Sequence, residues 1–80
     1  MDEARWYVIH AEGPLDATWS DRLGGLAISV SGTTNDMTTE LSGPLRDQSA
    51  LLGVLMCLYD LGMPLISVMY HPIQAKEQVS

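Results

Sequence analysis

The sequence predicts a single α+β domain with a βαββαβ plan, a small ferredoxin-like sandwich with a reduced first helix. Three features point to it: two adjacent runs of alternating apolar residues, an apolar strand-like segment near each end of the pattern, and a Leu-rich segment between helix-capping residues. The 80 residues contain no repeat and no linker. We therefore expect one domain over residues 1–80, ordered over about 5–72, with a polar C-terminal tail.

The first strand is predicted at Trp6–Glu12, where aromatic and β-branched residues give two apolar faces. Asp16 can cap a short helix after it, and Gly24 and Gly25 can stop that helix. About two helical turns fit between these signals, and a helix so short depends on packing rather than on propensity.

Two further strands are predicted at Leu26–Gly32 and Met37–Gly43, because apolar and polar residues alternate in both. The polar sequence TTND between them supplies turn residues, so the pair predicts a hairpin. Leu26, Ile28 and Val30 are expected to face the core. Pro44 is expected to end the second strand of the hairpin.

The main helix is predicted from Asp47, its N-cap, to Gly62, a left-handed C-terminal stop. Pro64 follows, and Leu65–Tyr70 then predicts the last strand. We expect residues 71–80 to form a polar tail that frays.

The first connection, Gly13–Gly25, decides the topology. A parallel crossover needs a dozen or more residues, whereas a hairpin needs only a few. The thirteen residues from Gly13 to Gly25 suffice for a crossover and carry a helical signal, which favours βαββαβ. The alternative is βββαβ, a three-strand meander followed by a helix and a strand.

The apolar stretch Ala50–Tyr70 contains a single charged residue, Asp60, yet it does not predict a membrane span. Gly62 and Pro64 interrupt it, and a spanning helix needs about 20 apolar residues. The stretch is better interpreted as a helix, a turn and a strand.

The formal net charge of −6, without a Lys/Arg cluster, argues against binding to nucleic acid or to an anionic membrane surface. The single cysteine, Cys57, excludes an intramolecular disulfide, and no paired Cys/His spacing predicts a metal site. The acidic N-terminus is unlike a signal peptide. With the free cysteine, it favours a cytoplasmic location.

Few residues are candidates for chemistry. His10 could act as a general base, but an apolar strand favours a role at an interface or on a sheet face. Cys57 could be a reactive thiol, but its apolar mid-helix position favours a packed one. Asp16 and Asp47 are explained as helix caps. We assign no catalytic residue, no cofactor and no metal, and favour a non-enzymatic role.

The main helix has more apolar surface than one sheet face requires. One arc is expected to face the sheet: Leu51, Val54, Leu55, Leu58, Tyr59, Leu61 and Gly62. Leu52, Met56 and Cys57 extend beyond this arc. Large exposed apolar surface usually marks a protein contact. We therefore predict a homo-oligomer, most simply a dimer, with two contact patches: Trp6, Val8, His10 and Met69 on the sheet, and Leu52, Met56 and Cys57 on the helix.

The chain resembles a group of small uncharacterised bacterial proteins of actinobacterial type. The shared pattern is Thr39, Leu41, Gly43, Asp47, Gln48, Ala50, Leu51, Asp60, Leu61, Gly62, Leu65, Ser67 and Val68, preceded by Gly13, Leu15, Trp19, Gly25 and Leu26. A more local likeness is to ACT domains, in which a Leu-rich helix, a Gly turn and an ISV-like strand recur. That likeness implies the same βαββαβ plan and binding of amino acids at subunit interfaces.

These observations favour a small protein-interaction or accessory module that self-associates and can meet another protein through its apolar helix face. A second hypothesis is an ACT-like domain that senses a small ligand. A third, less favoured, is a cofactor-free enzyme of the dimeric α+β barrel type, in which His10 and Trp6 would line a cleft.

Overall fold

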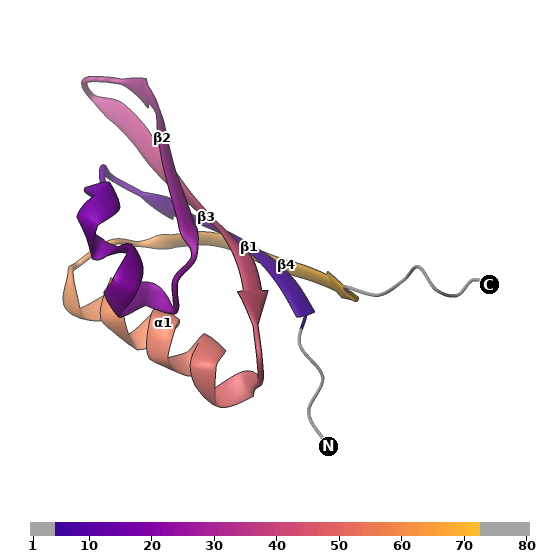
Figure 1. Ribbon diagram of the computed structural model, residues 1–80. Coiled ribbons are helices and arrows are strands. Elements are labelled where there is room, and N and C mark those ends of the chain that lie inside the picture. Colours follow the sequence, from indigo (N-terminus) through magenta and orange to yellow (C-terminus); the bar gives the residue numbers. More distant parts are fainter. Residues whose placement is uncertain (1–4, 73–80) are drawn as a thin grey trace.

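The computed structural model describes residues 5–72 of the chain. In chain order, its elements are strand β1 (Arg5–Glu12), the 3-10 helix η1 (Ala17–Leu23), strands β2 (Ala27–Thr33) and β3 (Asp36–Leu45), helix α1 (Gln48–Asp60) and strand β4 (Leu65–Pro72). The four strands form one sheet, and both helical segments lie on the same side of it (Figure 1). The α+β class predicted from the sequence is confirmed.

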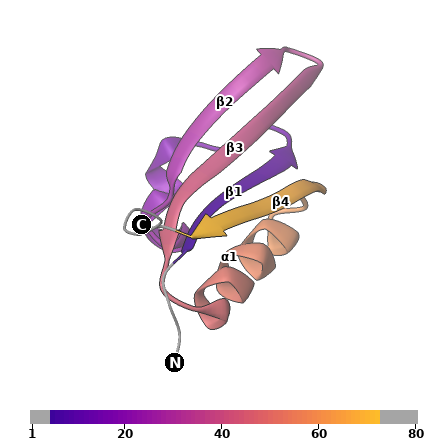
Figure 2. The same ribbon diagram turned by 90° about the vertical axis from the view of Figure 1, so that its right-hand side faces the viewer.

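The strands are ordered β2-β3-β1-β4 across the sheet, and every neighbouring pair is antiparallel. Figure 2 looks onto the face that carries no helix, where this order is seen directly. Because β3 lies between β1 and β2, the first connection crosses over a strand. The alternative meander, in which β1 and β2 would be neighbours, is therefore wrong.

The first helical segment is shorter and tighter than an α-helix. It begins as predicted at Asp16, whose Oδ1 accepts a hydrogen bond from the backbone N–H of Thr18 at 2.9 Å. It ends at Gly24, which adopts the left-handed conformation. Its seven residues adopt 3-10 turns, which are frequent in short connecting segments. Leu23 is its buried residue and fixes it on the core.

Helix α1 follows the predicted capping signals. Oδ1 of Asp47 accepts a hydrogen bond from the N–H of Ala50 at 2.8 Å. At the other end, Gly62 has φ +75°, and its N–H donates to the carbonyl of Tyr59 at 2.9 Å. Both helix ends thus satisfy backbone groups that would otherwise lack partners.

The core lies between the sheet and the two helical segments. Its buried residues are Tyr7, Ile9, Ala11, Leu15, Leu23, Leu26, Leu41, Leu45, Val54 and Leu58. Thr39 is the buried polar residue among them, and its hydroxyl donates to the carbonyl of Gly13 at 2.6 Å. This hydrogen bond links β3 to the turn after β1. It also gives the buried hydroxyl the partner that a buried polar group needs.

Two details of strands β2 and β3 differ from the sequence prediction. Strand β3 continues through Pro44 to Leu45. Strand β2 pairs with β3 only as far as Ser42. At Pro44, β3 therefore has β1 as its neighbour on one side and no strand on the other, and a proline is tolerated at such an edge position. Val30 faces the helix side but is 40% exposed, because the β2–β3 hairpin extends past the helices (Figure 1).

The last strand is also longer than predicted. Strand β4 includes His71 and Pro72, which pair with Trp6 and Arg5 of β1, so the polar tail does not begin at His71. The rest of the predicted tail, residues 73–80, lies outside the described residues.

Candidate functional site

The side of the sheet opposite the helices is uncovered within residues 5–72, and β1 crosses its middle (Figure 2). Burial alternates along β1: Tyr7, Ile9 and Ala11 are buried on the helix side. The residues between them, Trp6, Val8 and His10, therefore face the open side. Both faces of this strand are apolar, so the sequence does not predict which face is buried. In the structure, the face that packs against the helices is the buried one.

Strand β4 completes an apolar patch on this open face. Met69 pairs with Val8, and His71 pairs with Trp6, so these side chains are on the same side of the sheet. Trp6 is 40% exposed and Met69 is 56% exposed. We call Trp6, Val8 and Met69 the sheet patch. All three are residues that the sequence pattern singled out for an interface.

His10 lies next to the sheet patch and connects three strands through its side chain. Its Nδ1 is 3.1 Å from Oγ of Ser67 on β4, and its Nε2 is 3.3 Å from Oε1 of Glu40 on β3. The His10 and Glu40 side chains are 34% and 46% exposed. The sequence does not indicate this row, because Ser67 and Glu40 lie 57 and 30 positions from His10 along the chain.

The set Ser67, His10 and Glu40 contains the side-chain types of a serine hydrolase triad, but its surroundings differ from an active site. The three side chains lie in a row across β4, β1 and β3 on the open sheet face, and the contact between His10 and Glu40 is exposed. The backbone N–H groups of β1 and β3 beside His10 and Glu40 are engaged in the sheet ladders, whereas Ser67 lies on the edge strand β4. The row is better suited to hydrogen bonding with a surface placed on the sheet.

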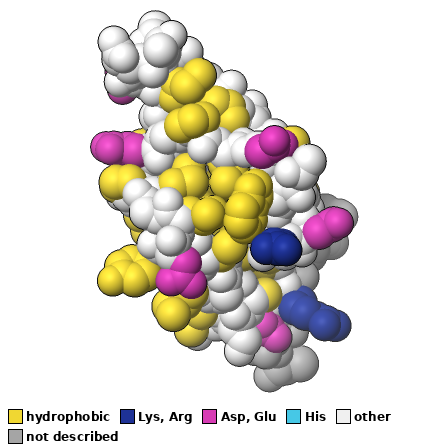
Figure 3. Space-filling model, turned by 90° about the vertical axis from the view of Figure 1, so that its left-hand side faces the viewer, with side chains coloured by type: hydrophobic (Ala, Val, Ile, Leu, Met, Phe, Trp, Pro, Cys, Tyr) yellow, Lys and Arg dark blue, Asp and Glu magenta, His cyan; other side chains and the backbone are white. Residues whose placement is uncertain are grey.

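Helix α1 carries a second apolar surface, on the side away from the sheet. Leu52 and Met56 are each 60% exposed, and Tyr59 is 77% exposed. We call these three residues the helix patch. Figure 3 shows hydrophobic side chains gathered on this side of the molecule, with acidic and basic side chains around them.

The predicted arc of α1 was wrong for Tyr59. The helix buries Val54 and Leu58. At about 100° per residue, Tyr59 points about 140° away from Val54, close to Leu52 and Met56. Cys57, by contrast, is half-buried and packs against the core, so it lies at the border of the helix patch rather than within it.

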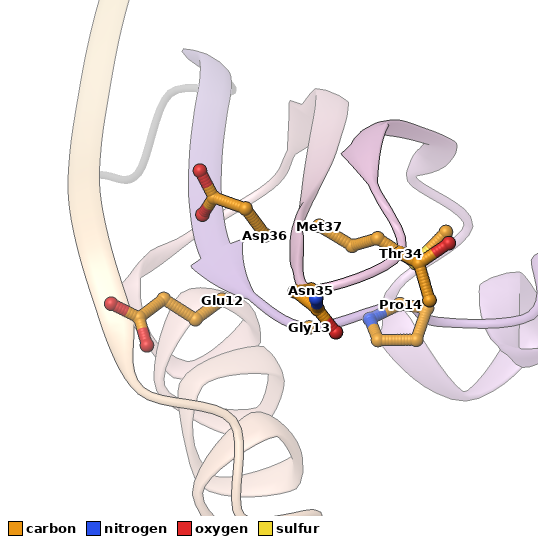
Figure 4. A pocket seen from close by; sticks show the side chains of 7 residues that line it. All are labelled: Glu12, Gly13, Pro14, Thr34, Asn35, Asp36 and Met37. Carbon is orange, nitrogen blue, oxygen red and sulfur yellow. The ribbon is translucent and has the colours of Figure 1, made fainter.

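Two hollows lie at the end of the sheet where β1 finishes. One is polar and is lined by Glu12, Gly13, Pro14, Thr34, Asn35, Asp36 and Met37 (Figure 4). The other is apolar and lies between α1 and the start of β4, lined by Leu55, Leu58, Tyr59, Met63, Pro64 and Leu65. Within residues 5–72, no group of three or more His, Cys, Asp or Glu side chains is arranged to hold a metal ion.

No helix in the described part of the chain combines the length and apolar character needed to cross a membrane. This agrees with the interpretation of Ala50–Tyr70 as three separate elements.

Comparison with known proteins gives one match. A family model described as a domain of unknown function (DUF8691) matches residues 6–69. The match begins at Trp6 in β1 and ends at Met69 in β4, so it includes all of the sheet patch and the helix patch. No curated protein and no solved structure matches the chain.

Proposed function

We propose that this chain, which belongs to the DUF8691 family, is a small interaction module that self-associates by packing its open sheet face against that of a second copy. The observation that carries this proposal is the sheet patch: Trp6, Val8 and Met69 lie together on a sheet face that no described element covers. A domain of 80 residues gains little stability from its own core, and oligomerisation is a common remedy.

The electrostatics favour this face as a homotypic contact. Two copies that each carry a net charge of −6 repel one another, so they can approach closely only through surfaces with few charges. The sheet patch has none, and the carboxylate of neighbouring Glu40 is engaged by His10. Around the patch, Ser29, Ser42 and Ser67 supply neutral groups that can form hydrogen bonds at the rim of a contact.

A truncation at the centre of the patch tests the proposal. Trp6→Ala removes the largest side chain of the sheet patch and should weaken self-association by about 1–3 kcal/mol, or roughly 5- to 150-fold in Kd. Leu52→Ala, on the opposite side of the molecule, is the matched control and should leave Kd unchanged. Sedimentation equilibrium gives both constants. Equal effects of the two substitutions would contradict the proposal.

In this proposal the module works in the cytoplasm, as the free thiol of Cys57 suggests. Its helix patch, which lies on the other side of the molecule, remains available to a different protein while two copies are associated through their sheets. The family would then include the small bacterial proteins that share the pattern from Thr39 to Val68.

A second candidate function is the sensing of a small ligand, and the polar hollow favours it. That hollow includes Gly13 and Pro14, the turn between β1 and η1, which is where ACT domains hold their ligands. Glu12 and Asp36 extend their carboxylates to the same side of it (Figure 4), which would suit a ligand with an amino group. A thermal-shift screen against amino acids tests this function, because a ligand that binds only the folded state raises Tm.

A further inference from the structure

Strand β4 forms one edge of the sheet, and its structure suggests a contact separate from the sheet face. Its neighbour is β1, and no other described strand pairs with it. A row of its backbone N–H and C=O groups therefore points outward, as on any edge strand, and can pair with a further strand. The single irregularity in its pairing falls between His10 and Ala11 of β1, so Ser67–Pro72 is a regular edge.

The first six residues of β4, Leu65–Tyr70, lack the usual protection of an edge. Natural edge strands are kept apart by lysines, by prolines or by inward-pointing charges. Leu65–Tyr70 contains no charged residue and no proline. Four of its side chains are about half exposed, between 49% and 56%: Leu65, Ile66, Met69 and Tyr70. The opposite edge, β2, instead presents Ser29, Ser31 and Thr33.

We propose that β4 also pairs antiparallel with β4 of a second copy, which joins two four-stranded sheets into one continuous sheet. A two-fold axis perpendicular to the sheet requires each strand to be complementary to itself. Pairing centred on Val68 meets this requirement, because it places Ile66 opposite Tyr70 and Ser67 opposite Met69, with no charge on either strand.

The second copy is favoured as the occupant over an unrelated peptide for two reasons. An uncharged, largely apolar edge is matched by another uncharged, largely apolar strand, and Leu65–Tyr70 of a second copy is such a strand. In addition, acidic copies can approach closely only along uncharged segments, and Leu65–Tyr70 is uncharged, whereas the other uncharged edge, β2, is mostly small and polar. This contact uses the edge of the sheet rather than its open face, so it does not depend on the proposed function.

Amide hydrogen exchange followed by NMR tests this pairing directly. In an antiparallel edge contact, every second N–H of residues 65–71 points outward and becomes hydrogen-bonded to the second copy. On going from micromolar to millimolar protein, these alternate amides should therefore exchange at least about tenfold more slowly, in proportion to the paired fraction. The same alternation should persist in Trp6→Ala, which alters only the sheet face. Exchange of the outward amides that is independent of concentration would overturn the proposal.

A charged substitution gives a second, independent readout. Ile66→Lys introduces a lysine on the edge and should weaken the edge contact about tenfold, or about 1.4 kcal/mol, since lysines on an edge strand oppose its pairing with another strand. Val30→Lys makes the matched change on the opposite edge strand and should leave β4 exchange unchanged. Protection of β4 that survives Ile66→Lys but is lost in Val30→Lys would assign the contact to β2 and contradict the proposal. Protection that appears only when an added peptide is present would identify a foreign strand as the occupant instead.

Discussion

Met69 of the edge strand β4 lies directly opposite Val8 of the central strand β1, and both side chains face the side of the sheet away from the helices. The two residues lie 61 positions apart in the chain, so only the strand register brings them together. This pair, with Trp6 beside it, gives the uncovered sheet face an apolar patch. The proposal of a self-associating module depends on that relationship.

The cap of helix α1 gives a first prediction about stability. Asp47→Ala removes the carboxylate that accepts the N–H of Ala50, and should lower the free energy of unfolding by about 1 kcal/mol. Asp60→Ala, at the last residue of the same helix, is the control. It removes an acidic charge near a helix C-terminus, where such a charge is unfavourable, so stability should stay equal or rise slightly. Urea denaturation at a fixed protein concentration measures both.

The buried hydroxyl of Thr39 gives a second prediction. Thr39→Val keeps the shape of the side chain but leaves the carbonyl of Gly13 without its donor, which should cost about 1–3 kcal/mol of stability. Thr38→Val, on the same strand but the other face, should change stability by less than about 0.5 kcal/mol. If both substitutions gave the same small change, the bond to Gly13 would not stabilise the fold.

Two glycines give a third prediction, with opposite signs. Gly24 has φ +70°, and a Cβ there would come within 2.9 Å of the Leu45 side chain, so Gly24→Ala should destabilise the protein by about 1 kcal/mol or more. Gly53 is an exposed helical residue, and a Cβ there would meet nothing within 4 Å. Gly53→Ala should therefore stabilise by up to about 1 kcal/mol. Thermal unfolding of the two variants, compared at equal concentration, checks both signs.

The helix patch gives a fourth prediction. Met56→Lys places a charge at the centre of the patch but touches neither the core nor the sheet face, so its stability and its self-association should match those of the unaltered chain. Binding to a second protein through the helix should be lost instead, because a lysine in the middle of an apolar contact is costly. Parallel affinity capture with unaltered and Met56→Lys protein, followed by mass spectrometry, would show whether any captured protein depends on this patch.

Local signals in the sequence predicted the elements well, because each depends on neighbouring residues. The caps Asp16 and Asp47 and the stop at Gly62 lie where the sequence placed them, since a cap is recognised by side-chain chemistry within a few positions. The hairpin of β2 and β3 also follows from local alternation.

Several features that depend on tertiary register were not predicted. The row formed by Ser67, His10 and Glu40 requires the exact pairing of three strands, which the alternation of single segments does not specify. Tyr59 was placed on the wrong side because a helix that is apolar almost all round does not reveal which arc will be buried. Pro44 was expected to end β3 because the sequence does not show that β2 starts too late to pair with it.

The mass of the protein in solution tests the central claim most directly. A single chain weighs 8.7 kDa, and association through the open sheet face predicts a mass at least twice that value at tens of micromolar protein. Multi-angle light scattering across a dilution series should show this mass falling toward that of one chain as the concentration decreases, because association depends on concentration. A constant mass of 8.7 kDa at all concentrations up to the millimolar range would contradict the account.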